Sequence, residues 1–135
     1  MYRHFEHVAD IGIVGEGATI EKAFQEAAKA MFAVMADINK IEPKKTVNIA
    51  VMAENEEELL VEWLNALLTE RDIKQMVFSR FDVKISGFKL IGTAYGEKID
   101  HEKHDIRTEV KAATYSQLKI KKAKGKVTVQ CIVDV

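Results

Sequence analysis

The chain has 135 residues, of which 47% are hydrophobic and 30% are charged. This length suits one ordinary domain, because division into two would leave each part with a poor core, and we expect a single domain over residues 1–135. The 20 basic and 21 acidic residues nearly balance, whereas a protein that binds nucleic acid on its own usually carries a basic excess. The balance therefore disfavours a tight, non-specific RNA or DNA binder.

Targeting and redox features of the sequence indicate a cytoplasmic protein. No apolar run approaches the roughly 20 residues that a membrane-spanning helix needs, and the N-terminal segment lacks the apolar core of a signal peptide. Cys131 is the one cysteine, so no intramolecular disulfide or cysteine-based zinc motif can form. We interpret Cys131 as a small buried hydrophobe rather than a reactive thiol, and we expect no membrane partner.

The N-terminal third of the sequence predicts a strand followed by a helix. An extended run over residues 2–14 precedes Gly15 and Gly17, which we expect to end the strand. Thr19 is a predicted N-cap. Apolar residues then recur at helical spacing, which indicates an amphipathic helix over residues 20–36.

A second strand and helix follow. Apolar and polar residues alternate over residues 46–51, the pattern of a half-buried strand. Asn55 and Glu58 form a capping-box pattern, which predicts the start of a helix over residues 56–71.

The rest of the chain is rich in predicted strands. We expect them over residues 77–85, 88–95, 106–112, 115–121 and 126–133, with hairpin connections at 86–87 and 122–125. This order of elements predicts an α+β fold with two helices packed on one side of a largely antiparallel sheet system.

Two acidic groups stand together at the end of the last predicted strand. Asp134 points away from the face that Val133 shares with Cys131, and Val135 adds the α-carboxylate that ends the sequence. Two carboxylates at a strand end suit a hard divalent cation. An ordinary solvated strand end explains the same residues, so the pattern alone leaves both interpretations open.

Asp10 lies within an otherwise apolar extended run, where aspartate is disfavoured. One interpretation is local, since Gly12 permits a bend and Asp10 can bond nearby backbone. The other is a metal site, in which pairing of the first and last strands brings Asp10 beside Asp134. The predicted topology permits this pairing without requiring it.

A polar segment over residues 96–105 and Lys111 beyond it are further candidates. The segment contains two histidines and suits a metal or partner contact as well as a solvated loop. Lys111 lies on the opposite face of its predicted strand from Val110 and is expected to be exposed, either to meet an anion or a partner's carboxylate or simply to be solvated.

The sequence has no Gly-rich phosphate loop, paired-histidine metalloprotease helix or serine elbow, and we assign no catalytic residue.

Four ordered pieces of the sequence resemble the archease family, and together they cover essentially the whole chain. They are residues 7–13 (HVADIGI), residues 62–68 (EWLNALL), the stretch from Gly96-Glu97 through His104 to residues 110–115 (VKAATY), and residues 133–135 (VDV). Val8 stands where the family often has threonine, and Ser116 stands where a histidine commonly follows the tyrosine. Neither departure removes a presumed metal ligand.

The resemblance implies an α+β fold and an accessory role. Archeases activate the RtcB-type RNA ligase, which seals tRNA halves in a GTP- and Mn²⁺-dependent reaction, by promoting its guanylation and multiple turnover. By the family pattern, Asp10, Asp134 and Val135 would bind a divalent cation, which is calcium in relatives, with Mn²⁺ or Mg²⁺ as alternatives. Lys111 would be a further functional residue. The implied partner is the ligase, with tRNA involved only indirectly and DNA not at all.

Two other functions stay open at this stage. One is an RNA-binding accessory module in tRNA processing, against which the balanced charge argues. The other is a small metal-dependent phosphohydrolase that uses Asp10, His104 and Asp134 and requires a polarising metal and a substrate pocket. We expect an activator that turns over no substrate itself.

Overall fold

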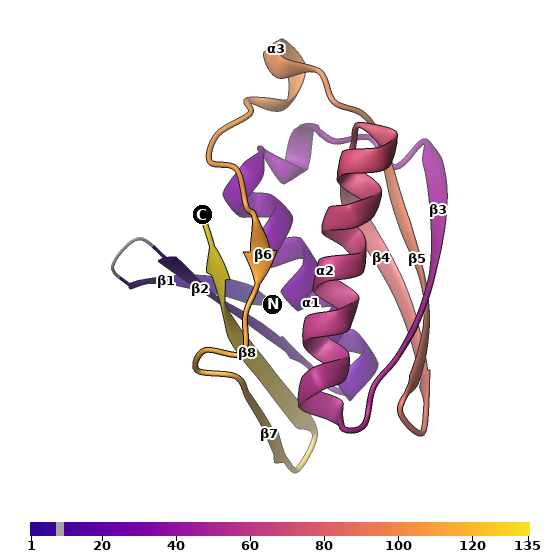
Figure 1. Cartoon of the computed structure of the whole chain (residues 1–135), viewed down its shortest axis with the longest axis vertical. Coiled ribbons are helices and arrows are strands. Elements are labelled where there is room, and N and C mark those ends of the chain that lie inside the picture. The colour runs from indigo at the N-terminus through magenta and orange to yellow at the C-terminus, as the bar shows by residue number, and fades with distance from the viewer. Residues whose placement is uncertain (8–9) are drawn as a thin grey trace.

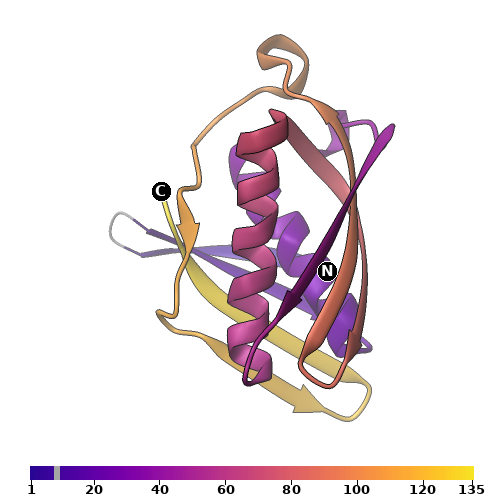
Figure 2. The same cartoon turned by 45° about the vertical axis from the view of Figure 1, so that its right-hand side comes forward.

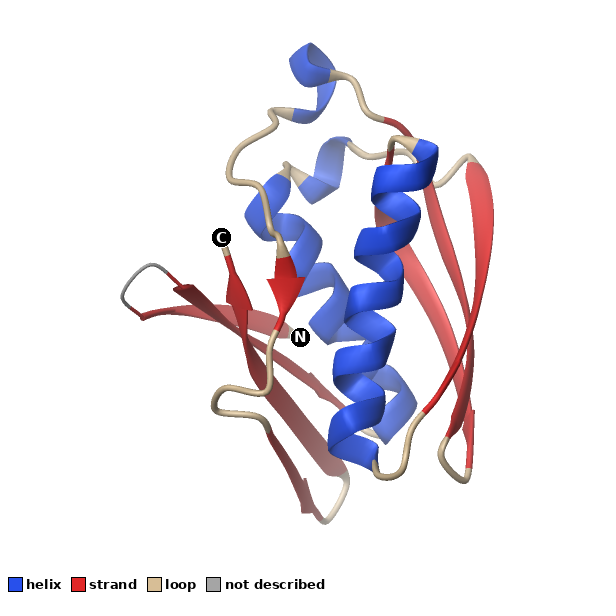
Figure 3. Cartoon of the chain, in the orientation of Figure 1, coloured by secondary structure: helices blue, strands red, loops and turns tan. Residues whose placement is uncertain are grey.

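Two antiparallel sheets flank a pair of long helices, and each sheet carries helices on one face (Figure 1, Figure 3). This computed structural model describes residues 1–7 and 10–135. Val8 and Ala9, which fall within the first predicted extended run, lie outside the described residues. The predicted α+β architecture, with helices packed on largely antiparallel sheet, is confirmed, and the strands are divided between two sheets.

The larger sheet contains both the first and the last strand of the chain. Its order is β1-β2-β8-β6, and β7 also pairs with β8. Its strands are β1 (Tyr2–His7), β2 (Asp10–Gly17), β6 (Ala112–Ala113), β7 (Lys119–Ala123) and β8 (Lys126–Asp134). The smaller sheet has the order β3-β5-β4 and consists of β3 (Lys45–Met52), β4 (Met76–Ser86) and β5 (Lys89–Lys98).

The two long helices, α1 (Ile20–Met35) and α2 (Glu56–Lys74), begin where the sequence predicts. The structure adds the short α3 (His101–His104) and a 3₁₀ turn η1 at Ile38–Lys40, which the sequence did not predict. Both predicted caps are confirmed, because Thr19 Oγ1 accepts the Lys22 N–H at 3.2 Å and Asn55 Oδ1 accepts the Glu58 N–H at 2.8 Å. These bonds satisfy amide groups that the first turn of a helix leaves without partners.

The first predicted strand is in fact two strands. β1 and β2 form an antiparallel pair in which Tyr2 is opposite Gly15 and His7 is opposite Asp10. The prediction of one extended run was wrong because residues 7–10 lack the Asn-Gly or Asp-Gly signature of most two-residue hairpins. Asp10 therefore begins a strand instead of interrupting one.

Gly15 and Gly17 lie inside β2, although the sequence predicted that they end the strand. The reason is the close approach of α1. A Cβ on Gly15 would lie 2.3 Å from the carbonyl oxygen of Ala23 and 2.4 Å from the amide nitrogen of Ala27. Glycine at this position lets the helix backbone pack directly on the strand.

Two of the predicted C-terminal strands differ from the structure. Residues 106–111 form no strand, and only Ala112–Ala113 pairs with β8 as β6. The strand predicted over residues 115–121 begins at Lys119, after Gln117 adopts a left-handed φ of 50°. The other three C-terminal strands and both hairpin turns agree with the prediction.

The helices and both sheets share one hydrophobic core. Trp63 is fully buried, and its indole Nε1 donates to the Phe24 carbonyl at 3.1 Å, which satisfies its one polar atom. Cys131 is also fully buried, and burial raises the pKa of its thiol to about 12, as expected of a small core residue. Among the described residues, no helix is long and apolar enough to cross a bilayer.

Replacing Gly15 by alanine is expected to destabilise the fold strongly. The new Cβ would meet backbone atoms of α1, so we expect the free energy of unfolding to fall by about 3 kcal/mol. Urea unfolding followed by circular dichroism measures this loss. Ala50→Val, at an exposed position of β3, should change stability by less than about 0.5 kcal/mol, and equal effects of the two changes would contradict the packing argument.

Candidate functional site

The pairing of β2 with β8 brings the two predicted carboxylates together. Asp10, the first residue of β2, is directly opposite Asp134, the last residue of β8. Residues opposite each other in an antiparallel pair project to the same face, with Cβ atoms about 5 Å apart. In Figure 2 the C mark stands at the end of β8, the long yellow strand. The structure therefore places Asp10 and Asp134 side by side, as a shared metal site requires.

The carboxylate pair fits a divalent cation. Like charges directly opposite each other destabilise a strand pair, and no ion pair found among the described residues involves Asp10 or Asp134. A hard cation takes carboxylate oxygens and offsets the repulsion. No group of three or more His, Cys, Asp or Glu side chains is placed to hold a metal in the described part of the chain. A cation held by the pair would take its further ligands from backbone or terminal oxygens, from water or from a partner.

Lys111 and Val135 lie next to the pair. The Lys111 amide donates to the Asp134 carbonyl at 2.7 Å, and Ala112 pairs with Asp134 in register. The Lys111 side chain is exposed, as predicted, although Lys111 does not lie in the strand that was predicted over residues 106–112. Val135 packs against the core through its side chain, and its α-carboxylate stays a predicted ligand. The four predicted site residues thus lie at one end of the β2–β8 pair.

Two polar side chains of α2 hold the segment that carries Lys111. The Asn65 side chain donates to the Ala113 carbonyl at 3.1 Å and accepts the Ala113 N–H at 2.8 Å. Arg71 Nη1 donates to the Val110 carbonyl at 2.7 Å. These bonds lie on either side of Lys111 and fix its backbone beside β8. Sequence reasoning missed both roles, because the partners are backbone groups far along the chain.

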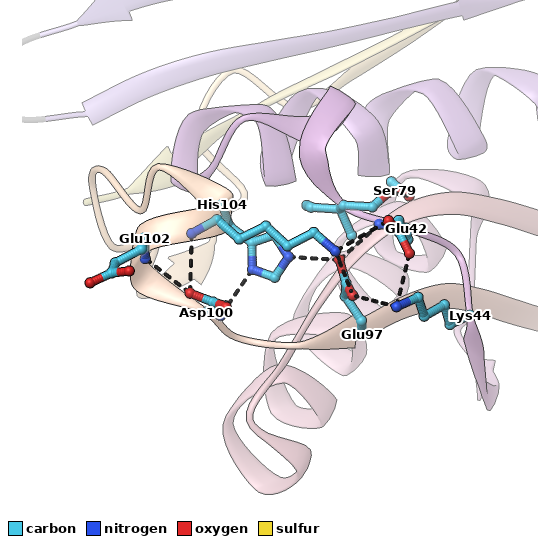
Figure 4. Close-up of polar contacts among 9 residues, drawn as sticks. Glu42, Lys44, Ser79, Glu97, Asp100, Glu102 and His104 are labelled. Carbon is cyan, nitrogen blue, oxygen red and sulfur yellow. Dashed lines mark hydrogen bonds and ion pairs between the residues drawn. The ribbon is translucent and has the colours of Figure 1, made fainter.

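The polar segment over residues 96–105 contributes to an ordered network around Glu97 and His104 (Figure 4). His104 is fully buried, its Nε2 lies 2.8 Å from Glu97 Oε2, and its Nδ1 accepts the Asp100 N–H at 2.9 Å. The bond from Asp100 assigns the ring proton to Nε2, so a neutral imidazole donates to Glu97. This arrangement differs from the solvated loop that the sequence suggested.

The Glu97 carboxylate accepts hydrogen bonds from several segments of the chain. Lys103 Nζ lies 2.9 Å from Glu97 Oε2, and the Glu42 N–H donates to the same oxygen at 3.0 Å. Burial favours the neutral carboxyl, but the bonds from Glu42, His104 and Lys103 outweigh it and lower the pKa of Glu97 from 4.5 to about 2. The carboxylate therefore ties β5 to α3 and to the segment before β3.

His104 does not join the aspartate pair. Its ring is enclosed and bonded to Glu97, and the described residues contain no three-membered cluster of metal-ligating side chains. The hydrolytic site considered from the sequence, with Asp10, His104 and Asp134 acting together, is therefore not formed.

Acid unfolding tests the Glu97 network. A carboxylate with a depressed folded-state pKa stabilises the fold above its unfolded pKa, and this contribution is lost as the pH falls toward the folded pKa. For Glu97 this window runs from pH 4.5 to about pH 2. We expect the wild-type protein to lose more unfolding free energy than Glu97→Gln across this window, as measured by urea unfolding at each pH.

The exposed Glu62 in α2 provides the matched control. Glu62→Gln should follow the wild-type pH dependence, whereas Glu97→Gln should already be less stable by about 2 kcal/mol at pH 7, because it weakens bonds made to a charged group. Parallel pH profiles for the wild type and Glu97→Gln would show that the network contributes nothing through its charge.

The similarity to known proteins extends over nearly the whole chain. The model of the Archease protein family matches residues 2–135. The archease proteins of Pyrococcus abyssi and Sulfolobus acidocaldarius are 44% and 41% identical, each over 99% of this chain and 98% of the relative.

Two solved structures share the fold. Protein 1598 of Methanobacterium thermoautotrophicum has a TM-score of 0.87 at 36% identity, with 99% of this chain and 98% of that chain covered. The Thermotoga maritima structure, described as an archease and possible chaperone, has a TM-score of 0.65 at 22% identity, with 100% and 98% covered, and supports the fold alone. The family match over nearly the entire sequence and the identities of its relatives show that this chain belongs to the archease family.

Proposed function

We propose that this protein binds a divalent cation and activates an RtcB-type RNA ligase, promoting the ligase's guanylation and repeated turnover in the joining of tRNA halves. The observation that carries the proposal is the register that pairs Asp10 with Asp134, in a chain of the archease family.

The proposed cation ligands are the side chains of Asp10 and Asp134 and the α-carboxylate of Val135. Calcium is the ion that the family resemblance implies, and Mg²⁺ and Mn²⁺ also accept such oxygen ligands. Asp134 is exposed and Asp10 is half-buried, so the site opens to solvent and leaves room for an oxygen from a partner. A cation held there would neutralise the opposed charges and offer a positive centre to the polyphosphate of the ligase's nucleotide.

Lys111 provides a second cationic group beside the pair. Its backbone is held on one side through the Val110 carbonyl and on the other through Ala113, while its ammonium is exposed. An ammonium on a fixed backbone can donate to a phosphate or to a carboxylate of the ligase. In this proposal the Asp10–Asp134 end of the larger sheet docks at the ligase's nucleotide site.

Cation uptake by the isolated protein tests the site without the ligase. In calorimetric titration with calcium, Asp10→Asn and Asp134→Asn should each lose roughly tenfold or more in affinity, because each change removes a charged oxygen ligand. Asp82→Asn alters an exposed carboxylate of β4 and should bind as the wild type does. Absence of uptake by the wild-type protein would remove the cation from the proposal.

A short C-terminal extension tests the role assigned to Val135. The added peptide bond converts the α-carboxylate into an amide carbonyl, which lacks the negative charge, so calcium binding should weaken. The same extension placed before Met1 should leave calcium binding unchanged. Equal affinities of the two extended proteins would exclude Val135 as a charged ligand.

Guanylation of the ligase tests the activation itself. With an RtcB-type ligase from the same source, the wild-type protein should raise the guanylation rate, and Asp10→Asn, Asp134→Asn and Lys111→Ala should lose most of that increase. Lys111→Ala keeps the backbone amide that bonds Asp134. A loss of activation by this variant therefore measures the contribution of the side-chain ammonium. Lys84→Ala, at an exposed position of β4, is the control. Full activation by the three variants, with their fold confirmed by circular dichroism, would refute the assignment.

A further inference from the structure

A cavity of about 330 Å³ lies beside the C-terminal end of α2, at the segment that follows α3. Four apolar side chains from separate parts of the chain line it, namely Met35, Val77, Ile99 and Ile106. Neither the three predicted metal ligands (Asp10, Asp134 and Val135) nor Lys111 lines this cavity. The cavity is therefore distinct from the carboxylate pair.

Arg71 brings a buried positive charge to the cavity wall. Its side chain is 10% exposed, and its Nε donates to Asp72 Oδ1 at 2.8 Å. Its Nη1 donates to the Val110 carbonyl at 2.7 Å and to Met35 Sδ at 2.9 Å. Nη2 forms no hydrogen bond with the described residues. The polar atoms of those residues that are fully enclosed and lack a partner do not include Nη2. Because Arg71 lines the cavity, Nη2 is the guanidinium nitrogen that we assign to a ligand there.

The charge of Arg71 is only partly compensated within the protein. Asp72 is its acidic partner, but the Asp72 side chain is 67% exposed, so water screens the pair. A buried guanidinium with free N–H groups favours an anion, and its planar donors match carboxylate and phosphate oxygens. Arg107 also lines the cavity, but its guanidinium is paired with Asp105 Oδ2 at 2.9 Å, and Asp72 and Glu109 oppose an anion.

We propose that this cavity binds a small organic anion, with one carboxylate or phosphate monoester group on an apolar body about the size of one ring. Arg71 Nη2 holds the anionic group, and Met35, Val77 and Ile106 enclose the body. The apolar wall favours such a ligand over a free inorganic anion, because apolar surface contributes to binding only when the ligand also brings apolar surface.

Benzoate and phenyl phosphate are suitable probes, since they share a ring and differ in the anionic group. Titrated into ¹⁵N-labelled protein, they should shift the NMR signals of the Ile99 and Thr108 amides and of Arg71 Nε. Neutral benzyl alcohol should bind roughly tenfold more weakly, because it lacks the charged acceptor. The tighter of the two anions identifies the preferred group, and inorganic phosphate should bind more weakly than phenyl phosphate.

Three variants separate the contributions to binding. Arg71→Met keeps most of the side-chain bulk and should weaken both probes roughly tenfold or more. Thr108→Trp, at an exposed position of the wall, should fill the cavity and abolish binding without altering Arg71. Asp72→Asn removes an opposing negative charge while keeping an oxygen acceptor for Arg71, so it should tighten the binding of both anions.

Asp82→Asn lies outside the cavity and should bind the probes as the wild type does. Because Arg71 also bonds Val110, the fold of Arg71→Met is checked by circular dichroism, and Thr108→Trp supplies a test that leaves this bond intact. Equal binding of benzyl alcohol, absence of localised shifts, unchanged binding by Thr108→Trp or weaker binding by Asp72→Asn would each overturn the proposal. These titrations contain neither added metal nor ligase, so they do not depend on the proposed function.

Discussion

The rest of the structure depends on the antiparallel pairing of β2 with β8. This pair is central in the larger sheet, and its helix-facing side carries the fully buried residues Ile13, Val129 and Cys131. Side chains alternate along a strand, so a slip of one residue would turn this apolar face outward and separate Asp10 from Asp134. Core burial and the carboxylate pair are therefore set by one register, and the packing of the core positions the candidate metal site.

The segment from residue 106 to residue 111 reaches the same site without a strand ladder. Backbone groups in such a segment need partners elsewhere, and three bonds provide them. The Arg107 amide bonds the end of α1, the Val110 carbonyl bonds α2 and the Lys111 amide bonds β8. Three elements of the core thus locate Lys111, which explains how an exposed lysine after an irregular segment has a defined position.

Local patterns predicted the long helices, their caps and the strands of the smaller sheet, because periodicity and capping depend on neighbours in sequence. The apolar stripe of α1 was only part of its buried surface. α1 packs against both sheets, so residues such as Ala28 are buried outside the stripe. The Asp10–Asp134 pair and the Glu97–His104 bond require the order of strands and the path of connections. No local pattern contains that information, so the predicted topology permitted the aspartate pair without establishing it.

Arg71 connects the two candidate sites through one side chain. Its Nη1 holds Val110, the residue before Lys111, and Arg71 also lines the cavity, where Nη2 is the proposed donor to the anion. A ligand that orders Arg71 therefore acts on the backbone that bonds Lys111 to Asp134. Binding linkage is reciprocal. If the cavity ligand changes the affinity for the cation by some factor, the cation changes the affinity for the cavity ligand by the same factor. α2 anchors residues 106–111, which have no strand ladder, through the bond from Arg71 to Val110. A coupling between the cavity ligand and the cation would therefore be transmitted at the C-terminal end of α2.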